Sequence, residues 1–343
     1  MAIFPLALVV STFFLGAAIA ASWDRDTLLL YGGIVEDVYN KINSSSIISS
    51  GSDYRITRDL YAAEKTGPFF GEPWVWIGCV AISDSRQNVV VVFRGTSNPG
   101  EWAKNLLVSR VSFTYLNGST ANSPGIHDGF LSLYTESDEG KISLRQQTVE
   151  ELRSLASSNP GYSISFVGHS LGGALATLAA FDVANSDIMD HVQGKKLSVY
   201  TFASPMVGDE TFKQLVEEAI SALDVLRVSD IRDVVPYLPS LNYVHVGEDF
   251  TVDGCQFDGN NNGGDVFSKV IEYHSLVRYM RTVSLIKGDG ITGGRINKKD
   301  LEGVMEFVRQ IISKANAGWS GFKNLVLAMK HYVQNFSASC TTN

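Results

Sequence analysis

One serine of the chain lies between two glycines, in a pattern suited to nucleophilic catalysis. Gly168-His169-Ser170-Leu171-Gly172 has the form G-x-S-x-G, and it separates a run of strand-forming residues from an Ala-rich run. A nucleophile elbow needs this strand-turn-helix setting, because glycines at both flanks let the strand and the helix pass close to each other at a strained turn. The new helix would also direct its N-terminal N–H groups at Ser170, where negative charge develops in acyl transfer. The pattern therefore predicts a serine nucleophile.

A serine nucleophile needs a base, which we expect to be His274. In folds with this elbow the order along the chain is serine, acid, histidine. His274 opens an amphipathic segment in IEYHSLVRYM, far enough beyond Ser170 to leave room for further strands. The other three histidines after the serine fit less well: His191 follows too soon, His245 lies in a strand-like run, and His331 lies in a separate C-terminal segment.

The base needs an acid, for which Asp233 is our candidate and Asp230 its nearest rival. Asp233 follows the strand-like VLRVS, so it would lie at the carboxyl end of a strand, where α/β sheets gather functional groups. Later aspartates lie in a Gly/Asn-rich stretch that we interpret as a solvated loop. The stretch CQFDGNNNGGD resembles a calcium loop in composition but lacks the closing Glu at the required spacing. We therefore expect neither a metal nor a cofactor.

Two backbone regions could stabilise an oxyanion. One donor would be the N–H of Leu171, directly after the nucleophile, and the second would come from an earlier strand–loop junction, where Thr96 ends NVVVVFRGT. Thr96 could equally be a loop threonine that caps the next segment. The stretch SNPGEWAKNLL follows and carries Trp102, which belongs either to a lid over an apolar pocket or to a surface helix.

Alternating helical and strand-like segments must position these groups. The continuous apolar run from Val89 to Phe93 indicates a strand covered on both faces. The pattern predicts an α/β layered fold whose mainly parallel central sheet is flanked by helices with right-handed crossovers, over residues 21–285. The expected strands are 74–83, 88–96, 162–167, 196–202 and 225–229, and the expected helices are 141–157, 173–185 and 210–223.

The N-terminal segment predicts a secretory route. Its first 23 residues carry no charged side chain, and residues 3–20 are nearly all apolar and end in a small-x-small pattern. We interpret residues 1–20 as a signal peptide, and an uncleaved anchor is the alternative. The sequons at Asn43, Asn117 and Asn335 are compatible with a secreted or secretory-pathway glycoprotein. Among three cysteines, Cys79 is expected to be a buried thiol, which makes Cys255 with Cys340 the better candidate for a disulfide, although the pairing is not fixed.

Beyond a Gly-rich link, residues 286–343 form a segment of different character. Two amphipathic helices are expected there, around 301–312 and 322–333, as a helical extension packed on the main domain or as a membrane-surface element. The chain has 28 basic and 36 acidic residues, a formal net charge of -8. No basic cluster is long enough to follow a phosphate backbone, so we expect an apolar or neutral substrate and no nucleic acid.

Seven blocks of sequence together resemble the class 3 (fungal-type) lipase family of α/β-hydrolases. They are VVFRGT with a following Trp, IHDGF, SFVGHSLGGALATLAA, YTFASPMVG, RVSDIRDVVPYLP, YVHVG and EYHSLVRYM, spread over residues 74–280. The resemblance implies Ser170 as nucleophile, Asp233 as acid and His274 as base, with Thr96 and Leu171 as oxyanion donors. It also implies a lid over residues 97–107 and structural roles for His127, His169 and His245. The segment after 285 is not covered by the family pattern.

The resemblance implies a serine ester hydrolase that acts at a lipid–water interface, with transient contact to a membrane or lipid-droplet surface. A secreted triacylglycerol lipase is the first expectation. Phospholipase A1, monoacylglycerol lipase and a feruloyl or short-chain esterase use the same chemistry, and an inactive lipid-binding scaffold is the alternative of another class. Pocket shape decides between the enzymes, and the sequence does not show it.

Overall fold

The computed structural model describes residues 24–40, 53–64, 73–96, 113–115, 123–192, 194, 196–219, 222–239, 242–254 and 266–286. Several predicted features lie outside these residues: the segment 1–20, the lid region with Trp102, the sequons at Asn43, Asn117 and Asn335, Cys255, Cys340, and the extension from residue 287 onward.

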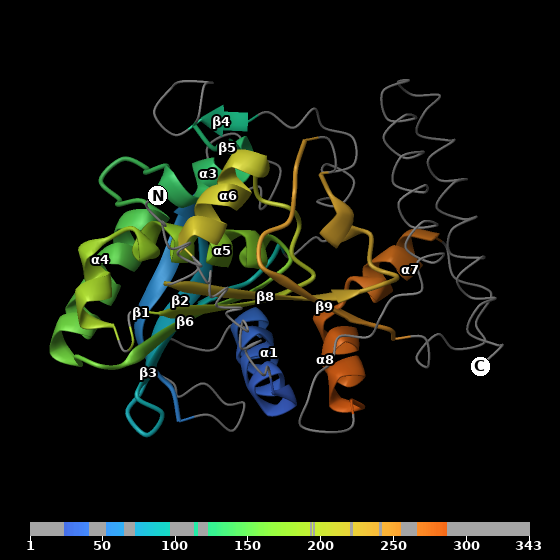
Figure 1. The fold of residues 1–343 in the computed structure, drawn as a ribbon, viewed down its shortest axis with the longest axis horizontal. Helices are drawn as coiled ribbons and strands as arrows, with labels where there is room; N and C mark the ends of the chain where they lie inside the picture. Colours follow the sequence, from blue (N-terminus) through green and yellow to red (C-terminus); the bar gives the residue numbers. More distant parts are fainter. Residues whose placement is uncertain are drawn as a thin grey trace, which may run out of the picture.

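A seven-stranded sheet forms the centre of the molecule (Figure 1), in the order β1-β2-β3-β6-β7-β8-β9. The pairs β1–β2 and β2–β3 are antiparallel, and every later neighbour from β3 onward is parallel. A separate two-stranded sheet pairs β4 with β5. The strands are β1 (Arg55–Ala63), β2 (Trp74–Ser83), β3 (Asn88–Phe93), β4 (Phe113–Tyr115), β5 (Gly125–His127), β6 (Ser163–His169), β7 (Leu197–Phe202), β8 (Leu223–Asp230) and β9 (Glu248–Val252).

Helices cover both faces of this sheet. On one face lie α3 (Asp128–Thr135), α4 (Leu144–Ser158), α5 (Leu171–Ala184) and α6 (Glu210–Glu218), and on the other lie α1 (Arg25–Tyr39) and α8 (Leu276–Ser284), as Figure 1 shows. The helix α7 (Val266–Tyr273) directly precedes α8. Two hydrophobic cores result, and β3 supplies both: Val91 packs in the first and Val90 in the second. Successive strand side chains point to opposite faces, which explains the unbroken apolar run in this strand.

The predicted α/β fold is confirmed, with differences at the ends of elements. β3 ends at Phe93, before the predicted Thr96, and the side chain of the next residue, Arg94, donates to the carbonyl oxygens of Trp76 and Gly95. The helix predicted from residue 173 begins at Leu171. The helix predicted to run to residue 223 ends at Glu218, because Leu223 pairs with Leu197 as the first residue of β8.

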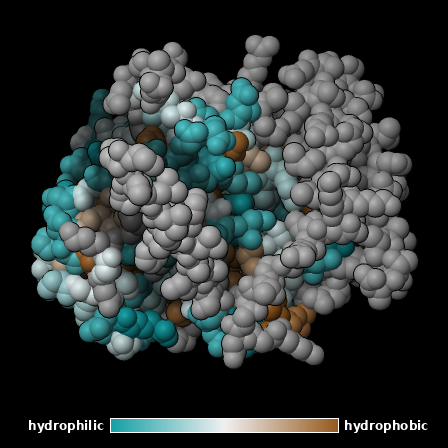
Figure 2. All heavy atoms as spheres, in the orientation of Figure 1, coloured by the Kyte–Doolittle hydropathy of each residue, from teal (hydrophilic) through white to brown (hydrophobic). Residues whose placement is uncertain are grey.

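Polar residues dominate the described surface in the view of Figure 2, with hydrophobic residues in small scattered patches. The large hydrophobic side chains recorded as exposed, Ile271, Val277 and Leu285, belong to α7, to α8 and to the residue after it. No helix within the described ranges is long and apolar enough to cross a membrane. Cys79 is a buried free thiol in the middle of β2, as predicted.

Candidate active site

Ser170 occupies a strained turn between strand β6 and helix α5. Its backbone has φ 59° and ψ -128°, a left-handed conformation that side chains other than glycine rarely adopt. Two backbone hydrogen bonds hold the turn: the Ser170 N–H donates to the Phe202 carbonyl at 2.9 Å, and the Ser170 carbonyl accepts from Gly173 at 2.9 Å. The surrounding strands and helix therefore impose the conformation that exposes the serine side chain to its partners.

The two glycines around Ser170 are required by backbone packing. A Cβ on Gly168 would meet the Gly172 backbone well inside 3.0 Å, and a Cβ on Gly172 would meet the Phe93 carbonyl equally closely. Because backbone atoms in a sheet and a central helix have nowhere to move, only glycine fits at either position. The elbow expected from the sequence is thus present, with strand, turn and helix in contact.

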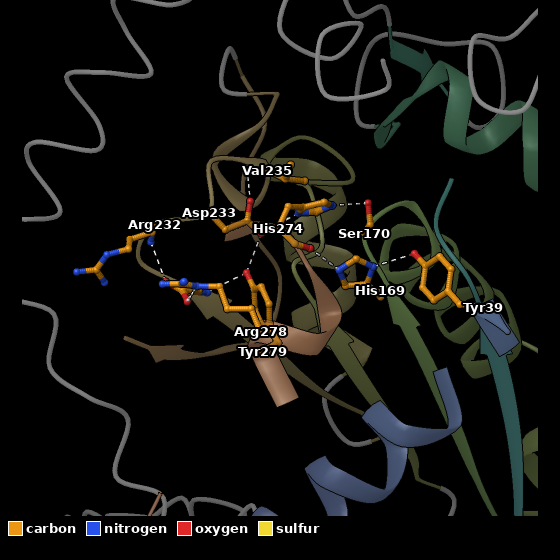
Figure 3. A network of polar contacts seen from close by, with 10 residues as sticks. Tyr39, His169, Ser170, Arg232, Asp233, Val235, His274, Arg278 and Tyr279 are labelled. Atoms are coloured by element: carbon orange, nitrogen blue, oxygen red, sulfur yellow. Dashed lines mark hydrogen bonds and ion pairs between the residues drawn. The ribbon is translucent and has the colours of Figure 1, made fainter. Parts of the chain in front are cut away.

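The Ser170 hydroxyl is directed at a histidine and not at its own helix. Ser170 is the N-cap of α5, yet its side chain makes no capping hydrogen bond, although serine commonly caps in this position. Instead its Oγ lies 2.8 Å from His274 Nε2, while His274 Nδ1 lies 2.8 Å from Asp233 Oδ2 (Figure 3). All three side chains are buried. Asp233 and His274 are 41 residues apart in the chain, and Ser170 and His274 are 104 residues apart, yet their side chains form one line of hydrogen bonds.

Asp233 is held by hydrogen bonds on both carboxylate oxygens. Oδ1 accepts from the Val235 N–H at 3.0 Å, and Oδ2 accepts from the Tyr279 hydroxyl at 2.8 Å. The Asp233 N–H in turn donates to the carbonyl of Asp230, the last residue of β8. The turn after the strand thus fixes the carboxylate where it can accept a hydrogen bond from the N–H at Nδ1 of His274.

Asp230, the rival acid, is used elsewhere. Its Oδ2 lies 3.1 Å from Arg278 Nε, and its Oδ1 accepts from the Arg232 N–H at 3.0 Å. Burial raises the pKa of Asp230, and the Arg278 guanidinium opposes that shift. No hydrogen bond joins Asp230 to His274 among the residues that the structure describes, so Asp233 is the carboxylate that orients this imidazole.

Both residues expected to supply oxyanion donors lie close to Ser170, Leu171 directly after it and Thr96 next to Gly95, which packs against it. Leu171 begins α5, so its N–H is one of those that a helix leaves without an intrahelical acceptor. Thr96 is buried, and within the described residues its Oγ1 has no hydrogen-bond partner. The preceding Gly95 lies against the nucleophile, since a Cβ on it would be 2.9 Å from Ser170 Cβ. A hydroxyl without a described partner and a helix N–H without an intrahelical acceptor, both near a serine, are the kinds of group that an oxyanion hole requires.

Comparisons with known proteins place the chain in a family. The profile described as "Lipase (class 3)" matches residues 90–243. Phospholipase A1-II 4 of Oryza sativa subsp. japonica is 34% identical over 256 residues, which are 68% of this chain and 63% of that protein. Phospholipase A1-IIgamma of Arabidopsis thaliana is 28% identical over 305 residues, 84% of this chain and 70% of that protein. The chain belongs to the class 3 lipase family. It spans slightly less than two thirds of the first rice relatives' length.

Solved lipases share the fold of this class 3 lipase. The triacylglyceride lipase of Rhizomucor miehei aligns with a TM-score of 0.53 at 21% identity, covering 79% of this chain and 94% of that one. Lipase II from Rhizopus niveus aligns with a TM-score of 0.50 at 25% identity, covering 66% and 80%. These likenesses establish the α/β-hydrolase architecture.

Three further histidines of this family member, the buried His127 and His169 and the partly buried His245, are neutral near pH 7. Burial lowers the pKa of His127 to about 4 and that of His245 to about 3, and it places the pKa of His169 well below the ordinary value. His127 caps α3, because its Nδ1 accepts from the Gly129 N–H.

Two tyrosines at the site were not predicted. Tyr279 lies five residues after His274 in the IEYHSLVRYM block. Its place on the helix directly after His274 could have marked it as a residue near the site. Tyr39, at the end of α1, contacts His169 and Gly95 and has no sequence signal of its own.

Proposed function

We propose that this class 3 lipase hydrolyses carboxylic esters of lipids through an acyl-enzyme formed on Ser170. The line of hydrogen bonds from Ser170 Oγ through His274 to Asp233 supports the proposal most directly. His274 Nε2 takes the proton from Ser170 Oγ as this oxygen attacks the ester carbonyl. Asp233 accepts from Nδ1–H and stabilises the imidazolium that forms.

The attack places negative charge on the former carbonyl oxygen. The Leu171 N–H and the donors of Thr96 would stabilise it, at positions fixed before the substrate arrives. His274 then gives its proton to the leaving alcohol, and the acyl group remains on Ser170. A water molecule, activated by the same imidazole, releases the fatty acid and restores the serine hydroxyl. Each step uses side chains and backbone groups of the chain.

For the substrate we propose a glycerophospholipid, cleaved at its sn-1 ester. The support is the set of relatives named phospholipase A1, at 28–34% identity, and it ranks this substrate above the triacylglycerol expected from the sequence. Triacylglycerol is the second candidate, and the fold likeness to a triacylglyceride lipase at 21% identity does not decide between them.

A labelling experiment followed by a substrate panel tests both levels. A fluorophosphonate probe should label the purified chain, and Ser170→Ala should abolish the labelling. An unlabelled wild-type protein with an intact fold would favour a lipid-binding scaffold. Phosphatidylcholine with different acyl chains at sn-1 and sn-2 should then release the sn-1 acid faster than trioleoylglycerol releases oleate. Faster release from trioleoylglycerol would favour the second candidate.

For localisation we propose the secretory pathway, on sequence alone: residues 1–20 as a cleaved signal peptide, 21–285 as the hydrolase domain and 286–343 as a helical extension. Some relatives carry the word chloroplastic in their names, so organelle import is the competing route. Mass spectrometry of the mature N-terminus, together with imaging of a C-terminal fluorescent fusion, separates the two. Plastid fluorescence, or an intact Met1, would contradict the secretory proposal.

A further inference from the structure

Tyr39 connects helix α1 to two parts of the candidate active site. It is the last residue of this helix, and its hydroxyl accepts the N–H of Gly95 at 2.8 Å. The same hydroxyl lies 2.8 Å from Nδ1 of His169, the residue before the nucleophile (Figure 3). One oxygen atom therefore touches both the loop that carries Thr96 and the elbow that carries Ser170.

The direction of these hydrogen bonds follows from their partners. Nε2 of His169 lies 2.9 Å from the carbonyl oxygen of His274. A carbonyl only accepts, so Nε2 carries the hydrogen, and in a neutral imidazole Nδ1 is then an acceptor. Tyr39 must therefore donate to His169. The result is an ordered chain that runs from Gly95 N–H to the Tyr39 hydroxyl, on to His169, and from His169 to the His274 backbone.

Both ends of the Gly95 residue are fixed. Its N–H is held by Tyr39, and its carbonyl oxygen accepts from Nη1 of Arg94 at 3.0 Å. A Cβ on Gly95 would collide with the Tyr39 hydroxyl and would lie 2.9 Å from Ser170 Cβ. The loop is thus packed directly on the tyrosine oxygen, and the position of the next residue, Thr96, depends on this contact.

We propose that Tyr39 is a positioning residue that fixes the Gly95–Thr96 loop and the His274 backbone relative to Ser170. The inference rests on the proposed ester hydrolysis. Oxyanion donors stabilise a transition state only when they are held in place before charge develops. Tyr39 touches no reacting group, so its removal should slow the chemical step and leave substrate affinity nearly unchanged.

Tyr39→Phe tests this role, and Tyr31→Phe is its matched control. Tyr31 also lies on α1, and its hydroxyl makes a buried hydrogen bond to Ser165 Oγ at 2.8 Å, away from Ser170 and His274. Both substitutions remove one hydroxyl from the same helix. We expect Tyr39→Phe to lower kcat by roughly tenfold to a hundredfold, since a small misplacement of reacting groups costs about that much, with KM changed less than about twofold. Tyr31→Phe should leave kcat unchanged.

The rate of fluorophosphonate labelling gives a second readout, because the phosphoryl oxygen enters the same donor site. It should fall in Tyr39→Phe in parallel with kcat. Circular dichroism and thermal unfolding confirm that both variants fold. An active wild type with Tyr39→Phe at wild-type kcat would overturn the inference, as would equal losses in both variants or a change confined to KM. A wild type that neither hydrolyses esters nor reacts with the probe would instead overturn the proposed function.

Discussion

The Tyr279 hydroxyl donates a 2.8 Å hydrogen bond to Oδ2 of Asp233, the same oxygen that faces His274 Nδ1. The hydroxyl also accepts the N–H of Asp230 at 2.9 Å, so it connects the end of β8 to Asp233. Tyr279 is fully buried on α8, five residues after His274 in the chain. Helix α8, which follows His274, thus orients Asp233 through Tyr279, and Asp233 in turn orients His274.

Tyr279→Phe should therefore weaken catalysis. The substitution leaves Asp233 with one donor fewer and the Asp230 N–H without its acceptor. We expect kcat to fall about tenfold and the free energy of unfolding to fall by about 1–3 kcal/mol, measured by steady-state kinetics and urea unfolding. Tyr134→Phe is the matched control, since Tyr134 on α3 also donates to an aspartate, Asp182, which lies at the end of α5 opposite Ser170. Equal losses of kcat in both variants would remove the orienting role.

The strain at Ser170 predicts an unusual order of stability. Both Ser170→Ala and Ser170→Gly should lose ester hydrolysis by several orders of magnitude. Because the positive φ favours glycine, Ser170→Gly should be more stable than Ser170→Ala by about 1 kcal/mol. The same pair of substitutions at Ser165, within strand β6, should give the opposite order. Chemical unfolding of the four variants measures their free energies of unfolding. If the Ala and Gly variants had the same order of stability at Ser170 and at Ser165, the elbow would not be strained.

Gly168 should not tolerate a methyl group. Its Cβ would meet the Gly172 backbone, so Gly168→Ala should lower the free energy of unfolding by about 3 kcal/mol or more. Gly140→Ala provides the comparison: Gly140 has a positive φ of 71°, which Gly168 does not have, and a Cβ on Gly140 would meet nothing within 4 Å. Only the conformational cost of about 1–2 kcal/mol applies there. Similar losses at the two positions would show that the close packing at the elbow is not what requires glycine.

Stability should depend on pH through His127. Burial lowers the pKa of His127 to about 4, whereas in the unfolded chain it is near 6.5. Between these values the unfolded chain binds a proton that the folded chain does not, so stability is lost as the pH falls from about 6.5 to about 4. The full loss is on the order of 3 kcal/mol.

His127→Asn isolates this contribution. Asparagine can still accept from the Gly129 N–H but does not titrate. Urea unfolding at pH 7 and at pH 4.5 should show a smaller loss in the variant than in the wild type. The loss should become smaller but should not disappear, because the pKa values of His169 and His245 are also lowered in the folded chain. Identical losses in both proteins would show that His127 does not contribute.

The sequence by itself determined what is encoded by local spacing. A strand, a turn with two flanking glycines and a helix around Ser170 specify an elbow, because close packing at Gly168 and Gly172 excludes every side chain larger than hydrogen. The unbroken apolar run in β3 specifies a strand buried on both faces. The order of Ser170, Asp233 and His274 along the chain also follows from the sequence.

The tertiary structure decided what depends on contacts between distant segments. The sequence favours Asp233 and leaves Asp230, three residues earlier, as its nearest rival, and the pairing of Asp230 with Arg278 and of Asp233 with His274 separates them. Tyr39 has no local signal, because its contact with His169 spans 130 residues. Hydrophobic periodicity specifies which face of an element is buried, whereas a hydrogen bond of 2.8 Å requires both elements to be docked, and docking is a property of the whole fold.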